Sequence, residues 1–125
     1  MKLSELFGKG IPTLSFEVFP PKTSSNYDSV KFATSEIAKL NPDFMSVTCG
    51  AGGKTDIYTA DIAASLIRDY GVTSIAHMTC VGTSKESAEK RIRELEALGI
   101  ENILGLRGDI PEEFQEAQAT FYLIP

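Results

Sequence analysis

The chain has 125 residues, which is enough for one domain with a hydrophobic core. Its 42% hydrophobic and 23% charged residues are typical of globular proteins. The net charge of −5 and the absence of basic clusters argue against nucleic-acid partners. No apolar run approaches the roughly 20 residues of a spanning helix, and "MKLSELFGKGIP" at the start does not resemble a signal peptide. We expect a cytoplasmic protein with no membrane or nucleic-acid partner.

Four short apolar runs begin about thirty residues apart and predict β-strands. They span residues 13–19, 44–49, 74–80 and 102–108. The segments between them have the 3.6-residue apolar period of helices, over 26–40, 56–70 and 84–98. Thr83 and Glu86 have the spacing of a capping box for the third helix, and Gly71 and Gly99 stand where helix C-caps belong. The pattern predicts consecutive βα units.

Strand–helix alternation at this spacing predicts an α/β fold with a parallel sheet. The last segment, 111–125, begins with proline and two acids and predicts a short fourth helix. No linker or low-complexity segment divides the chain. We therefore expect a single domain over residues 1–125, with an atypical tail at 112–125.

Polar residues recur near the carboxyl ends of the predicted strands. Side-chain alternation predicts that they share one face, with Leu104 and Leu106 on the opposite, apolar face. The polar set is Glu17, Thr48, His77, Arg107 and Asp109. In α/β sheets and barrels this edge is where sites are built, so the pattern predicts a shared site.

Each of these residues also has a plainer interpretation. Glu17 sits either at an exposed rim or as a buried carboxylate with a raised pKa. His77, the one histidine in the sequence, is an ordinary hydrogen-bonded core residue in the alternative interpretation. Arg107 and Asp109 can form an ion pair with each other, and Thr48 alone is uninformative.

The stretch "VTCGAGGKT", residues 47–55, resembles a phosphate-binding P-loop but departs from it. The pattern G-x-x-x-x-G-K-[ST] requires glycine where this chain has Thr48. Cys49 and Cys80 do not form a C-x-x-C pair, so we expect free thiols and no metal site.

Four motifs together resemble the N-terminal half of methylenetetrahydrofolate reductases. They are "SFEVFPPK" (15–22), "DFMSVTCGAGG" (43–53), "AHMTC" (76–80) and "ENILGLRGDIP" (101–111). The resemblance implies a (β/α)8 TIM-barrel type fold of which about the first four βα units are present. It also implies an oxidoreductase of one-carbon metabolism and methionine biosynthesis. Such a flavoprotein forms 5-methyltetrahydrofolate from 5,10-methylenetetrahydrofolate, with FAD as cofactor and NAD(P)H as electron donor.

The resemblance also implies roles for individual residues. Glu17 matches the general acid, and both Glu17 and Asp109 match substrate contacts. Thr48 matches a nicotinamide or substrate contact beside the flavin. Further FAD-contacting positions are matched by Cys49, Ala51, His77, Arg107, Gly108 and Asp109. Cys49 stands where many members of the family have tyrosine, so an aromatic contact to the cofactor is absent.

The resemblance covers about residues 1–111, whereas a complete barrel needs about 250 residues. We therefore expect an incomplete enzyme that self-associates or binds a complementary second half. Two alternatives stay open at this point. One is an inactive half-barrel, either a binding module or a truncated product, and the other is an unrelated α/β nucleotide-binding protein that uses the glycine-rich loop at 50–55.

Overall fold

The computed structural model describes residues 1–50 and 56–108. Four strands form one sheet in the order β1-β2-β3-β4, and every neighbouring pair is parallel. The strands are β1 (Ser15–Val18), β2 (Phe44–Val47), β3 (Ser74–Thr79) and β4 (Asn102–Leu106). The predicted α/β class and the sequential parallel order are confirmed.

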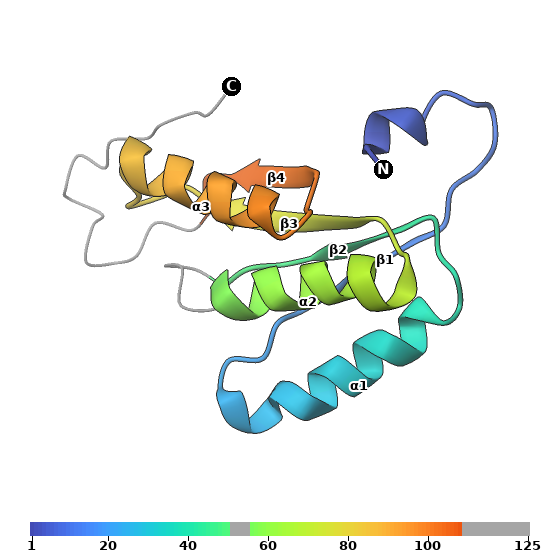
Figure 1. Cartoon of the computed structure of the whole chain (residues 1–125), viewed down its shortest axis with the longest axis horizontal. Helices are drawn as coiled ribbons and strands as arrows, with labels where there is room; N and C mark the ends of the chain where they lie inside the picture. The colour runs from blue at the N-terminus through green and yellow to red at the C-terminus, as the bar shows by residue number, and fades with distance from the viewer. Residues whose placement is uncertain (51–55, 109–125) are drawn as a thin grey trace.

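Three helices alternate with these strands, as the 3.6-residue periods predicted. They are α1 (Tyr27–Ala38), α2 (Asp56–Tyr70) and α3 (Lys85–Ala97), with short 3-10 turns η1 (Leu3–Glu5) and η2 (Ser24–Asn26). Figure 1 shows α1 and α2 running side by side along the sheet. The predicted fourth helix, 111–125, lies outside the described residues. Across residues 1–50 and 56–108, no helix is long and apolar enough to span a bilayer.

Helix α3 begins one residue later than the sequence predicted. Its N-cap is Ser84, whose side chain accepts a hydrogen bond from the backbone N–H of Ser87 at 3.2 Å. The predicted capping box of Thr83 and Glu86 is therefore wrong. Threonine and serine are both favoured at the N-cap position, so the sequence alone does not choose between Thr83 and Ser84. In the structure the Ser84 hydroxyl accepts from an N–H group of the first turn that has no partner within the helix.

The two predicted C-cap glycines are confirmed. Gly71 and Gly99 have φ values of +64° and +84°, a region that favours glycine. After α3, the Ile100 N–H donates to the Leu95 carbonyl and the Gly99 N–H donates to the Glu96 carbonyl. This pair of bonds is a Schellman motif, which ends the helix and turns the chain into β4.

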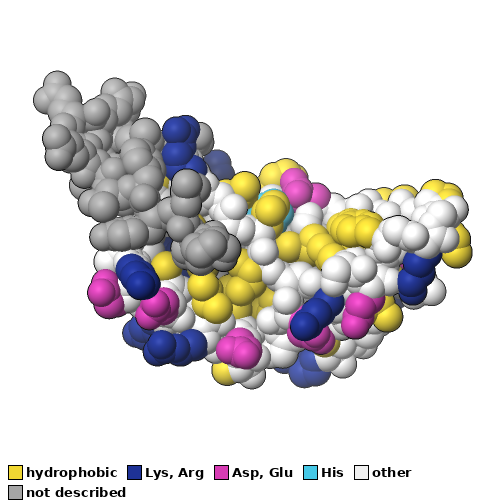
Figure 2. Space-filling view, turned by 90° about the horizontal axis from the view of Figure 1, so that it is seen from above, with side chains coloured by type: hydrophobic (Ala, Val, Ile, Leu, Met, Phe, Trp, Pro, Cys, Tyr) yellow, Lys and Arg dark blue, Asp and Glu magenta, His cyan; other side chains and the backbone are white. Residues whose placement is uncertain are grey.

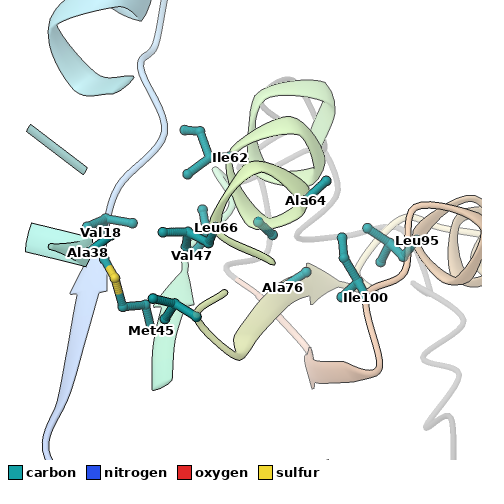
Figure 3. Close-up of a cluster of buried hydrophobic side chains, with 12 residues drawn as sticks. Val18, Ala38, Met45, Val47, Ile62, Ala64, Leu66, Ala76, Leu95 and Ile100 are labelled. Carbon is teal, nitrogen blue, oxygen red and sulfur yellow. The ribbon is translucent and has the colours of Figure 1, made fainter. Parts of the chain in front are cut away.

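The hydrophobic core lies between the sheet and the helices (Figure 3). It joins strand residues to helix residues, with Met45, Val47, Ala76, Ile62 and Leu66 almost completely buried. Burial of the larger of these side chains, those of methionine, valine, isoleucine and leucine, contributes roughly 1.5–3 kcal/mol each relative to exposure. We call this side of the sheet the helix face.

The opposite side, which carries Glu17, Ser46 and His77, is called the site face. Strand register places Leu104 beside His77 and Leu106 beside Thr79, so both leucines lie on the site face. The predicted phase of β4 is therefore wrong. Ile103 takes the core position instead. In "NILGL" apolar residues occur at both odd and even positions, so the alternation of side chains alone does not determine which of them face the core.

The N-terminal segment covers the amino end of the site face, away from the carboxyl ends of the strands. The ring of Phe7 packs edge-on against Phe44 with 5.9 Å between centroids, and the Leu3 N–H donates to the side-chain oxygen of Asn102 at 2.9 Å. On the site face, these contacts lie at the amino ends of the strands, so they do not cover the carboxyl ends, where we expect a site.

Candidate functional site

Glu17, Ser46 and His77 meet across three adjacent strands. The Ser46 hydroxyl donates a hydrogen bond to Oε2 of Glu17 at 2.9 Å, and Nε2 of His77 lies 3.6 Å from the same oxygen. The Glu17 side chain is 49% exposed, whereas the His77 side chain is only 10% exposed. The carboxylate is therefore oriented by two neighbours on one oxygen and remains accessible to a ligand. Figure 2 shows the histidine colour at the surface beside acidic side chains.

Thr48 is fixed through its backbone at the end of β2. Its N–H donates to the Val18 carbonyl at 3.0 Å, and its carbonyl accepts from the Thr59 hydroxyl at 2.8 Å. The first bond comes from β1 and the second from α2. The start of the glycine-rich loop is thereby held in place from both sides.

Cys49 follows directly and is half-buried. Burial raises the pKa of its thiol, and hydrogen bonds to the side chain and backbone of Thr79 act in the opposite direction. The net shift is upward, which favours the neutral thiol over the nucleophilic thiolate. Cys49 and Cys80 are both free thiols, as expected.

Arg107 and Gly108 continue from β4 against the end of β3. The Val81 N–H donates to the Arg107 carbonyl at 2.8 Å. Gly108 has a φ of +82°, and a Cβ added there would lie 3.1 Å from the Cβ and Cγ2 atoms of Thr79. The backbone of Gly108 therefore packs directly on Thr79, which no larger residue can do without displacing it.

Two of the predicted site residues, Ala51 and Asp109, lie outside the described residues. The alternative ion pair of Arg107 with Asp109 is untested for the same reason. Among residues 1–50 and 56–108, no group of His, Cys, Asp and Glu side chains has the arrangement of a metal site.

The sequence reasoning missed an ion pair behind the strand ends. Arg91 of α3 contacts the carboxylate of Asp56 at the start of α2 through Nη2, and its Nη1 donates to the Thr79 carbonyl at 3.1 Å. Burial raises the pKa of Asp56, and the charge of Arg91 partly offsets that rise. These residues are far apart in sequence, and no local spacing signals their contact.

Ser46 was also missed as a site residue, although its signal was available. Its position in "FMSVTC" gives it the same parity as Thr48, and serine is a short donor suited to a neighbouring carboxylate. A cleft of about 600 Å³ lies between α2 and α3, bordered by Asp56, Arg91 and Met78 and reaching His77. It opens beside the helices rather than beside the Glu17 carboxylate.

The family model of methylenetetrahydrofolate reductase matches residues 2–123. The chain belongs to this family. It is 32% identical over 123 residues to methylenetetrahydrofolate reductase (NADH) 1 of Zea mays, covering 96% of the chain and 21% of the relative. It is 33% identical over 111 residues to 5,10-methylenetetrahydrofolate reductase of Pectobacterium carotovorum, covering 89% of the chain and 37% of the relative.

The Escherichia coli 5,10-methylenetetrahydrofolate reductase is 31% identical over 103 residues, covering 82% of the chain and 35% of the relative. The chain thus spans between about a fifth and just over a third of the length of these curated relatives. The parallel sheet with helices agrees with part of a TIM barrel, the fold that the family resemblance implied. No observation on the described residues favours an unrelated nucleotide-binding protein, and the lysine of the glycine-rich loop lies outside them.

Proposed function

We propose that this chain takes part in the FAD-dependent reduction of 5,10-methylenetetrahydrofolate to 5-methyltetrahydrofolate, with Glu17 as the proton donor. The observation that carries the proposal is the Glu17 carboxylate, half-exposed near the carboxyl edge and oriented by Ser46 and His77. Family membership supports it independently. We also propose a cytoplasmic location.

Protonated Glu17 donates its proton to a ring nitrogen of the bound folate. The bond between that nitrogen and the methylene carbon then breaks, and its electron pair stays on the nitrogen. The five-membered ring is thereby opened, and the methylene carbon becomes an iminium with the other ring nitrogen. Because Ser46 and His77 contact the same oxygen, Oε2, they fix the plane and direction of the carboxyl group. A positioned general acid of this kind contributes roughly 10²–10⁴ in rate.

The residues at the strand ends fit a flavin in chemical character. Thr48 and Cys49 offer backbone and small side chains, and Gly108 brings the main chain close to Thr79 without a side chain of its own. Thr48, Cys49, His77, Arg107 and Gly108 are the described residues proposed to hold FAD. When bound, FAD supplies the hydride to the substrate.

The electron donor is proposed to be NADH, with NADPH as the alternative. The printed names of the relatives from Zea mays and Arabidopsis thaliana specify NADH. Comparing the rates of flavin bleaching with the two nucleotides decides between them.

The site face is proposed to be covered by a complementary half-barrel or by a second copy of this chain. In the described sheet, β1 and β4 each have a strand neighbour on one side only, and Leu104 and Leu106 are 44% and 39% exposed. Open edges and exposed apolar surface favour association. We expect light scattering to show self-association of the purified 125-residue polypeptide, with weak FAD binding in flavin-fluorescence titrations. A monomer that holds FAD stoichiometrically and turns over would contradict this expectation.

A chimera tests the proposed chemistry. Residues 1–125 replace the matched segment of the Escherichia coli relative, and the two half-reactions are followed separately. Glu17→Gln is expected to leave flavin reduction by NADH nearly intact and to slow folate reduction by roughly 10²–10⁴. Glu36→Gln is the matched control, because Glu36 is exposed and pairs with Lys39 on α1. An equal loss in both half-reactions would make Glu17 structural.

A further inference from the structure

Arg91 joins three elements behind the strand ends. Its guanidinium contacts the Asp56 carboxylate at the start of α2 and donates to the Thr79 carbonyl at the end of β3, while its own backbone belongs to α3. The side chains of Arg91 and Asp56 are only 22% and 29% exposed. This contact is therefore better shielded from water than the exposed Arg93–Glu89 pair on the same helix.

Thr79, the residue that Arg91 holds, touches the ends of the two neighbouring strands. On one side it lies near Cys49: Val47 pairs with Ala76 in the β2–β3 register, so Cys49 follows β2 beside the end of β3, and Thr79 acts on the pKa of its thiol. On the other side it packs against Gly108, which follows β4. A shift of Thr79 would therefore move both of the strand ends that are proposed to carry the cofactor.

Asp56, the partner of Arg91, lies at the start of α2. Asp56 is the first residue of α2, where a carboxylate also interacts favourably with the helix dipole. Thr48 and Cys49 precede the glycine-rich stretch at 50–55, and Asp56 follows it. Arg91 thus contacts Asp56 at the start of α2 and Thr79 at the end of β3.

We propose that Arg91 is a positioning residue of the site, acting through Asp56 and Thr79 to hold Cys49 and Gly108 in their cofactor-facing arrangement. That Cys49 and Gly108 face a cofactor rests on the proposed function. That Arg91 holds them in place through Asp56 and Thr79 does not. Arginine suits the task because its planar fork presents separate nitrogens to the carboxylate and to the carbonyl. Lysine has a single ammonium group and preserves the charge, but it does not reproduce the fork geometry.

The reactivity of the Cys49 thiol reports this arrangement in the purified chain without any added cofactor. The chain is treated with iodoacetamide under native conditions, and modification at Cys49 is followed by peptide mass mapping. Arg91→Met is expected to raise the Cys49 rate by about tenfold more than it raises exchange of the core amides, because loss of the clamp lets the half-buried thiol open more often. Arg91→Lys should fall between Arg91→Met and the wild type.

Arg93→Met is the matched control, because it removes an arginine of the same helix whose side chain is 77% exposed. It should leave the Cys49 rate within about twofold of the wild type. Backbone amide exchange at Met45, in the middle of β2, distinguishes local from global opening. Met45 exchange reports the global loss of stability, so the proposal requires the Cys49 rate to rise by clearly more than Met45 exchange does. Equal acceleration at both positions would make Arg91 a general stability residue and overturn it.

An unchanged Cys49 rate in folded Arg91→Met would also overturn the proposal. If Arg91→Met does not fold, Arg91→Lys decides, with a Cys49 rate raised about threefold or more expected and an unchanged rate overturning it. FAD titration is run in parallel where wild-type binding is measurable, and Arg91→Met should weaken it by about tenfold. If the wild-type chain and its chimera hold no FAD, the proposed function fails while the thiol measurement still decides the role of Arg91.

Discussion

Replacing Gly108 with alanine tests how tightly the end of β4 packs on β3. Gly108 has a φ of +82°, which costs an L-residue about 1–2 kcal/mol. The added Cβ would also meet two Thr79 carbons at 3.1 Å and Cγ1 of Val81 at 3.3 Å. Overpacking of this kind costs about 1–3 kcal/mol. We expect Gly108→Ala to lower the free energy of unfolding by about 2–5 kcal/mol.

Two other glycines separate the cost of the positive φ from the cost of the close contact with Thr79. Gly71 has a φ of +64° with no atom within 4 Å of a built Cβ, so Gly71→Ala carries the backbone cost alone. Gly105 meets no neighbour and has no positive φ, so Gly105→Ala should be neutral or stabilising by about 0.4–1 kcal/mol.

Urea unfolding followed by circular dichroism measures all three variants. With an m-value of about 1.5 kcal/mol/M, the expected loss moves the Gly108→Ala midpoint down by about 1.5–3 M. The Gly71→Ala midpoint should fall by about 1 M. If Gly108→Ala and Gly71→Ala lose the same stability, the close contact with Thr79 does not exist in solution and the reasoning is refuted.

Ser84→Ala removes the N-cap acceptor of Ser87 and should cost about 1 kcal/mol in urea unfolding, whereas a loss below 0.3 kcal/mol would place the cap elsewhere. Arg91→Met should cost about 1–3 kcal/mol at pH 7, between the values for exposed and buried pairs. The pKa of Asp56 in the folded chain is raised above its ordinary value of 3.8. Ionisation of this carboxyl group therefore lowers the free energy of unfolding as the pH rises above 3.8, and loss of the Arg91 charge makes that decrease larger. The Arg91→Met loss should therefore shrink as pH falls from 7 towards 3.5, and a pH-independent loss would refute the electrostatic explanation. Leu66→Ala should cost about 2–5 kcal/mol in the same assay, because Leu66 is completely buried; a loss under 1 kcal/mol would contradict the core assignment.

Local patterns in the sequence predicted most of the fold. Gly71 and Gly99 ended their helices because only glycine reaches the required φ cheaply. The thirty-residue spacing of apolar runs predicted the parallel order, since short βα connections allow few other arrangements. The cap of α3 was misplaced by one residue because Thr83 and Ser84 are both good capping residues and only tertiary geometry selects Ser84.

The site was predictable only where it depends on position along a strand. Glu17 and His77 were placed on one face by alternation, and the register brings them to 3.6 Å. The predicted phase of β4 was wrong because "NILGL" has no polar side chain in its interior that would distinguish the two faces of the strand. The Asp56–Arg91 contact was not predictable, since it joins two helices through packing rather than through any sequence spacing.

The most direct test of the central claim asks which face of the sheet binds the ligands. His77 is the one histidine in the sequence, so its ring signals in NMR spectra are unambiguous, and it contacts Glu17 on the site face. Met78 follows it on the helix face beside the α2–α3 cleft, and its methyl group reports that face. On titrating the chain with FAD and with 5-methyltetrahydrofolate, we expect the His77 ring signals to shift with saturation while the Met78 methyl signal stays in place. His77 also borders the cleft, so a shift of the Met78 methyl signal, with or without one at His77, would place the ligands in the cleft and contradict the account.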